Sequence, residues 1–165
     1  MQSTGVEHLQ ATSTRYEFKQ RFRVPARQAY EWCTDYRTDD LSLMGEKGYR
    51  GIQRLTEDTL ILTESVRTGT RTVRKRKLVK LNPKELRWYN VQLEGPFKHS
   101  TFLYHIQPEG TNASRLRFTG LIVIYSKKKL PSRRVSRIAH MERKFDAHAW
   151  VSLAKAMERE IATRK

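Results

Sequence analysis

The sequence contains one cysteine, Cys33, and no apolar run close to the length of a membrane-spanning helix. A single cysteine excludes a disulfide framework and a cysteine-rich metal site, and it fits a reducing cytoplasm. A membrane span would need about 18 consecutive apolar residues. The first residues, MQSTGVEHLQATST, lack the basic start and apolar middle of a secretion signal. We expect a cytoplasmic protein, at most peripheral to a membrane, with residues 1–14 as a flexible tail and one domain at 15–165.

Motifs of known catalytic chemistry are also missing. The five histidines have no metal-ligand spacing, no serine lies in a nucleophile elbow, and no glycine-rich phosphate loop occurs. We therefore predict no metal site and no cofactor, and we favour a binding protein over an enzyme. Cys33 is interpreted as a small core residue.

Acidic residues are scarce beside basic ones. There are 33 Lys and Arg against 17 Asp and Glu, a formal net charge of +16. Residues 1–66 carry 9 basic and 10 acidic side chains, whereas residues 67–165 carry 24 and 7. Such a field attracts polyanions whether or not the protein binds one specifically. A well-solvated surface and an anionic partner are both compatible with it.

The chain begins with a strand pattern followed by two short helices. Residues 15–24, RYEFKQRFRV, alternate apolar and polar side chains, as in a half-buried strand. Pro25 suits the beginning of a helix, and residues 26–36 have helical spacing. A second short helix is predicted to end near Gly45.

About six strand patterns follow between residues 49 and 125, separated by short turns. Short connections between neighbouring strands favour an antiparallel meander. We place one tight turn at Thr68-Gly69.

From Pro131 to Thr163, apolar residues recur every three or four positions, which predicts a helix about 50 Å long. We expect a break near Asp146, which could cap a second segment. The apolar side of such a helix needs a partner, and the antiparallel sheet is the only large surface available. The predicted fold is α+β: a curved antiparallel sheet of about seven strands gripping the C-terminal helix. A cleft between sheet and helix would suit a ligand.

Several stretches resemble the START, or Bet v 1-like, helix-grip superfamily (SRPBCC). RFRVPARQAYEWCTDY is similar to that family's first strand and helix, and HAWVSLAKAMEREI resembles its closing helix. LEGPFKHSTFLYHIQPEG and SRLRFTGLIVIYS resemble the polyketide cyclase/dehydrase and coenzyme-Q-binding branch, with Tyr104, Ile106 and Pro108 in the places of its Trp-x-Phe-x-Pro. The resemblance covers nearly everything from Arg15 onward. It implies the helix-grip fold and a cavity for a hydrophobic small molecule such as a lipid, quinone or polyketide.

The stretch RTVRKRKLVK, residues 71–80, departs from the family by its six basic residues, which fall on both faces of a strand. With Thr68-Gly69 as the turn, the residue numbers of each directly opposed pair sum to 137. Glu64, Lys75, Lys77 and Asn90 then lie on the same face of the sheet. On a concave face they would be polar anchors in an apolar pocket. On a convex face they would be solvated, which we favour for the lysines because Lys is rarely fully buried.

The candidate residues form three sets. The candidate ligand-cavity residues are Phe18, Gln20, Phe22, Leu62, Glu64, Lys75, Lys77, Trp88, Asn90, Tyr104, Phe118 and Phe145. The candidate basic surface consists of Arg74, Arg76, Lys127, Lys128, Lys129, Arg133, Arg134 and Arg137. For a cyclase-type or hydrolase-type reaction in the cavity, Glu64 and Tyr104 are the candidate catalytic residues.

Three functions therefore stay open. The first is binding or transport of a hydrophobic small molecule, and the second is docking of the basic surface on an acidic membrane or a nucleic acid. Residues 127–144 contain no aromatic side chain for stacking on bases, which favours the membrane over the nucleic acid. The third is an enzyme.

Overall fold

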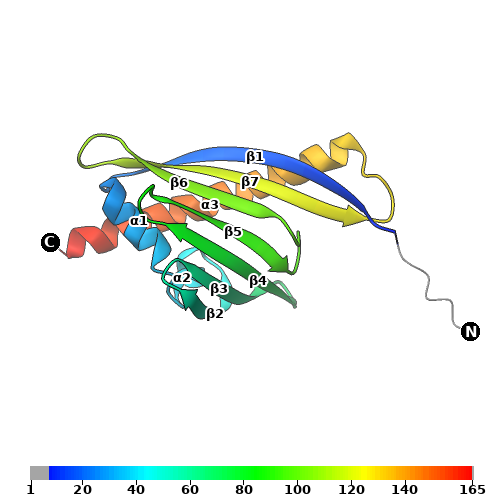
Figure 1. Cartoon of the computed structure of the whole chain (residues 1–165), viewed down its shortest axis with the longest axis horizontal. Helices are drawn as coiled ribbons and strands as arrows, with labels where there is room; N and C mark the ends of the chain where they lie inside the picture. Colours follow the sequence, from blue (N-terminus) through cyan, green and yellow to red (C-terminus); the bar gives the residue numbers. More distant parts are fainter. Residues whose placement is uncertain (1–7, 165) are drawn as a thin grey trace, which may run out of the picture.

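The computed structural model describes residues 8–164 (Figure 1). The strands are β1 (Gln10–Phe22), β2 (Lys47–Thr56), β3 (Thr59–Thr68), β4 (Arg71–Asn82), β5 (Arg87–Glu94), β6 (Thr101–Pro108) and β7 (Ser114–Ser126). The helices are α1 (Ala26–Thr34), α2 (Asp40–Leu43) and α3 (Ser132–Thr163).

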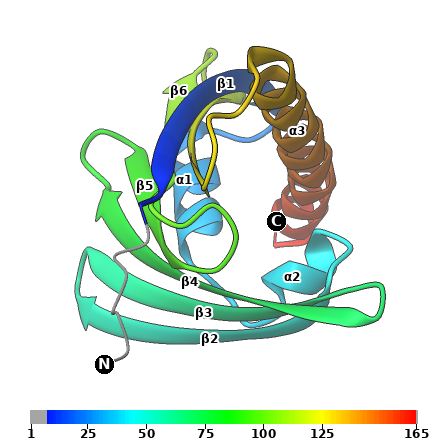
Figure 2. The same cartoon turned by 90° about the vertical axis from the view of Figure 1, so that its right-hand side faces the viewer.

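The seven strands form one antiparallel sheet in the order β1-β7-β6-β5-β4-β3-β2. Each strand from β2 to β6 pairs with the next in the chain, and β1 closes onto β7. Figure 2 shows the sheet curving around an interior with α3 along its open side. The predicted α+β architecture is confirmed, including the two short helices after the first strand.

The first strand begins earlier than the sequence pattern indicates. Gln10 already pairs with Ser126 of β7, so residues 10–14 belong to the sheet and not to a tail. Residues 1–7 of the predicted tail lie outside the described residues.

Helix α3 is continuous over 32 residues, and the predicted break near Asp146 is wrong. The surrounding residues include no glycine or proline that would interrupt a helix. The Asp146 carboxylate accepts a hydrogen bond from Tyr16 Oη of β1 instead of capping a second segment. Near the other end of α3, Glu160 accepts a hydrogen bond of 2.9 Å from Trp32 Nε1 of α1. These two contacts hold α3 against β1 of the sheet and, near the end of the helix, against α1.

Alternate residues of β1, β6 and β7 fill the interior. The buried members of this set are Tyr16, Phe18, Phe22, Ile106, Phe118 and Ile122. The larger core cluster lies where α1 and the last turns of α3 meet the sheet, and it includes Phe22, Leu153 and Met157. Farther along α3, towards its beginning, the interior is hollow.

Candidate functional site

Two connected hollows lie between the sheet and α3. The central cavity, of about 160 Å³, is bounded by β2 to β7 and by all three described helices. The mouth, of about 660 Å³, continues from it towards the β3–β4 turn and the β5–β6 turn. Lys75, Asn90, Tyr104 and Asp146 are among the residues that line both.

Aromatic side chains make most of the apolar wall. All three tryptophans of the sequence, Trp32, Trp88 and Trp150, line the central cavity. The rings of Trp88 and Tyr104 are stacked, with centroids 4.7 Å apart and 2° between their planes. Concave, mostly aromatic walls with a few polar groups are typical of small-molecule sites.

A buried ion network forms one side of the cavity. Glu64, which is 2% exposed, receives Arg50 Nη2 at 2.7 Å and Lys77 Nζ at 2.8 Å. Arg50 also reaches Asp40 at 2.5 Å. Burial by itself raises the pKa of Glu64, but Lys77 and Arg50 more than offset it and hold the pKa at about 2. Glu64 is therefore an ionised carboxylate with both oxygens occupied.

Two polar groups of the cavity have no partner among the described residues. Asn90 is 6% exposed, and its Oδ1 accepts no hydrogen bond, although its Nδ2 donates to Tyr104 Oη at 3.2 Å. Lys75, on the same face of β4 as Lys77, forms no ion pair or hydrogen bond within residues 8–164. Buried polar groups are nearly always paired, so the Asn90 oxygen is available to a ligand, and the half-buried Lys75 ammonium group can meet one as well.

Three further titratable groups here have a raised pKa. Burial raises the pKa of the Tyr104 phenol, which stays protonated at neutral pH. Burial likewise raises the pKa of Asp146 and, with help from the Asp146 charge, that of Glu142 at the mouth.

The structure places nine of the twelve predicted cavity residues along the central cavity. They are Leu62, Glu64, Lys75, Lys77, Trp88, Asn90, Tyr104, Phe118 and Phe145. The other three come from β1: Phe18 stacks on Phe118, Phe22 is fully buried in the core, and Gln20 donates to the carbonyl of Arg21. None of these three lines the cavity.

Two details of the predicted hairpin need correction. Glu64 pairs with Lys75 and Leu62 with Lys77, so opposed numbers sum to 139 and the turn residues are Gly69-Thr70. Glycine stands at the first central position of the turn, where its positive φ of 61° is required. The side chains of Lys75 and Lys77 point into the cavity. The solvated orientation that we favoured is therefore wrong, and the Glu64 carboxylate compensates the positive charge of Lys77 there. The shift of two residues preserves which side chains share a face.

Sequence reasoning missed several residues of the cavity, above all Arg50, Asp146 and Trp150. Arg50 lies directly opposite Glu64 in the β2–β3 pair, so the register of that hairpin carried a signal. Asp146 and Trp150 are four residues apart on α3 and face the same side.

The fold is matched by solved structures, whereas no family model and no curated protein matches the sequence. Zhui aromatase/cyclase from Streptomyces sp. R1128 is 13% identical, with a TM-score of 0.70 over 93% of this chain and 96% of that chain. Norcoclaurine synthase from Thalictrum flavum, in complex with dopamine and hydroxybenzaldehyde, is 12% identical, with a TM-score of 0.70 over 94% and 90%. A START superfamily protein from Mycobacterium smegmatis is 17% identical, with a TM-score of 0.64 over 92% and 99%.

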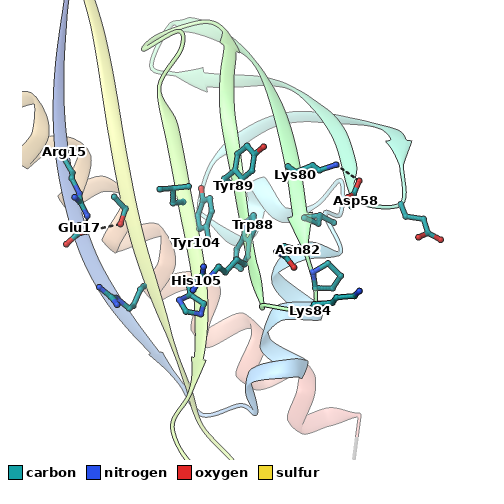
Figure 3. Close-up of a pocket in the computed structure, with 17 residues that line it drawn as sticks. Arg15, Glu17, Asp58, Lys80, Asn82, Lys84, Trp88, Tyr89, Tyr104 and His105 are labelled. Atoms are coloured by element: carbon teal, nitrogen blue, oxygen red, sulfur yellow. Dashed lines mark hydrogen bonds and ion pairs between the residues drawn. The ribbon is translucent and has the colours of Figure 1, made fainter.

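The chain has the START, or Bet v 1-like, helix-grip fold. A third hollow, the outer-face groove, lies on the convex side of this helix-grip sheet and has a volume of about 870 Å³ (Figure 3). Tyr89, Leu103 and His105 lie along it, and Lys80 is paired there with Asp58 at 2.9 Å. Because the groove is open and lies outside the grip between sheet and α3, it is not the candidate site.

The predicted basic surface residues are all exposed. Arg74 and Arg76 lie on the outer face of β4, and the other six lie at or just before the beginning of α3. Among residues 8–164, no helix combines the length and apolar character needed to cross a bilayer.

Proposed function

We propose that the protein binds a hydrophobic small molecule in the central cavity and mouth, between the sheet and α3. The observation that carries this proposal is an aromatic-walled cavity in which Asn90 keeps a buried, unpaired hydrogen-bond acceptor. A filled core would leave neither the space nor the unpaired group. The solved aromatase/cyclases and START proteins of the same fold support the proposal by analogy.

The test uses the three cavity tryptophans as the readout. Methyl decanoate, a neutral apolar probe, should change the tryptophan fluorescence saturably, and organic extracts of the purified protein should contain a co-purified apolar compound. Ala149 lines the central cavity, so Ala149→Met should fill it and weaken probe binding about 10-fold or more without loss of stability.

Val151→Met is the matched control, because Val151 is on α3 but 40% exposed. It should leave probe binding unchanged. Equal binding by the Ala149→Met variant and the wild type would place the ligand elsewhere, and no binding of the probe by the wild type would contradict the proposal.

A second candidate is an acid–base reaction on the bound molecule, of the cyclase type that two neighbours' names describe. Asp146 and Tyr104 favour it, because both face the cavity and burial raises the pKa of each. Glu64 is unsuited to the role, since two cations hold it ionised. Recovery of a chemically altered molecule after incubation would favour this candidate over simple binding.

A further inference from the structure

Lys75 is the one cation of the central cavity without a direct ion pair in the described chain; it acts on the Glu142 and Asp146 carboxyls only at longer range. Arg50 and Lys77, the other two, are held by Asp40 and Glu64 at 2.5 to 2.9 Å. Lys75 stands directly across from Glu64 in the β3–β4 pair, yet Glu64 turns to the diagonal Lys77. The Lys75 ammonium group is thereby left at the junction of the central cavity and the mouth.

Cationic and acidic side chains around the two hollows are equal in number. Five cationic and five acidic side chains line them together. Burial raises the pKa of Glu142 and Asp146, two of these acidic side chains, and the Lys75 charge acts against that shift in both. Lys47 and Arg67, at the rim of the mouth, are exposed to water, which weakens their interaction with an ion inside. Lys75 is therefore the inward-facing cation that no direct ion pair occupies among the described residues.

Resting on the proposed function, we infer that the ligand is an apolar acid whose carboxylate pairs with Lys75 at the junction while its apolar body lies against the tryptophans of the central cavity. A charge-assisted hydrogen bond in a partly buried site is stronger than one in water. It also orients the molecule, with the acid towards the mouth and the apolar end inward. Asn90, opposite Val79 and four residues deeper along β4 than Lys75, offers an acceptor about 13 Å farther in.

Three probes of the same chain length that differ in the charge of the head group test this inference: decanoate, methyl decanoate and decylamine. Each is titrated at near-neutral pH with tryptophan fluorescence as the readout. The wild type should bind decanoate more tightly than the ester. Lys75→Gln should weaken decanoate binding about 10-fold or more and leave methyl decanoate within about twofold.

Arg74→Gln is the matched control, since it removes the same charge from the neighbouring residue on the outer face of β4. It should change neither affinity, which separates a contact with Lys75 from a general effect of net charge. Tryptophan emission and thermal unfolding establish that both variants are folded.

Three other outcomes would each overturn either this inference or the proposed function. Equal binding of acid and ester that is insensitive to Lys75→Gln overturns this inference and leaves the proposed function standing. Tighter binding of decylamine than of decanoate also overturns it, because the ionised Glu142 and Asp146 would then govern the site. Failure of all three probes to bind overturns the proposed function itself.

Discussion

Glu64 shows how a single buried charge is maintained in this interior. Its carboxylate is 2% exposed, and the loss of its hydration is compensated by Arg50 and Lys77. Removing one member of such a network leaves the others buried without a counter-charge, which costs about 3–5 kcal/mol. The network therefore ties β2, β3 and β4 together beside the cavity.

The depressed pKa of Glu64 makes this stabilisation dependent on pH. In the folded protein the pKa is about 2, below its ordinary value of 4.5, so the folded state binds fewer protons than the unfolded state between these values. The contribution is complete above about pH 4.5 and is lost as the pH falls towards 2. We expect Glu64→Gln to lower the free energy of unfolding by about 3–5 kcal/mol at pH 7. The difference from wild type should shrink below pH 4.5, as measured by urea denaturation across pH 7 to 2.5.

Glu94→Gln provides the comparison. Glu94 is exposed and pairs with the exposed Arg76 at 3.4 Å, so its loss should cost less than about 0.5 kcal/mol at any of these pH values. A Glu64→Gln effect as small as this, or one that does not change on acidification, would contradict the network described here.

Among the elements, β1 and α3 are joined by hydrogen bonds, one of which a glycine makes possible. Tyr16 of β1 lies over Gly120 of β7, its direct partner in the sheet, and donates to Asp146 of α3. A Cβ at residue 120 would stand 2.6 Å from Tyr16 Cε1 and 2.7 Å from Tyr16 Oη. The absence of a side chain at Gly120 is therefore what allows the phenol to reach the helix.

We expect Gly120→Ala to lower the free energy of unfolding by about 1–3 kcal/mol, because the added methyl group displaces the Tyr16 ring. In a Tyr16→Phe background the ring has no hydrogen bond to lose, and the cost should fall by at least about 0.5 kcal/mol. Urea denaturation of the four proteins in this cycle measures both values. Gly51→Ala, whose Cβ would meet nothing closer than 3.5 Å, should be nearly neutral. Equal costs of Gly120→Ala in both backgrounds would show that the hydrogen bond is not involved.

The elements also show what the sequence predicts and what it does not. Order and type of the elements follow from local periodicity, so the sheet and the C-terminal helix were predictable. The register of β3 and β4 depends on which residue of Thr68-Gly69-Thr70 takes a positive φ, and the pattern did not decide this. The unbroken α3 and the inward lysines depend on partners far along the chain, namely Tyr16 for Asp146 and Glu64 for Lys77. Such long-range compensation has no local signature.

For the molecule as a whole, the basic surface at the beginning of α3 and the mouth of the cavity lie near one another. The basic beginning of α3 carries exposed Arg133, Arg134 and Arg137. Farther along the same half of the helix, Met141 and Phe145 are 59% and 54% exposed, and Phe145 also lines the mouth. Figure 1 places this half of α3 at the opposite end of the molecule from α1 and the C-terminus. An apolar ligand would enter or leave beside a basic surface with apolar side chains.

This arrangement predicts salt-sensitive binding to anionic membranes. Each basic residue near an acidic bilayer contributes about 1 kcal/mol. The triple variant Arg133→Gln, Arg134→Gln, Arg137→Gln should therefore bind phosphatidylserine-containing vesicles about 100-fold more weakly at low salt, as measured by co-sedimentation.

The control removes three charges from the other end of the molecule, through Arg23→Gln, Lys84→Gln and Lys155→Gln, all of them exposed. If the beginning of α3 is the docking surface, this control should bind the vesicles nearly as well as the wild type. Equal losses in the two triple variants would mean that the net charge of +16 alone, and not its position beside the mouth, attracts the membrane. Added salt does not distinguish docking through the beginning of α3 from attraction by net charge, because it screens the charges in both cases. The comparison of the two triple variants distinguishes them, because these variants differ in the position of the removed charges.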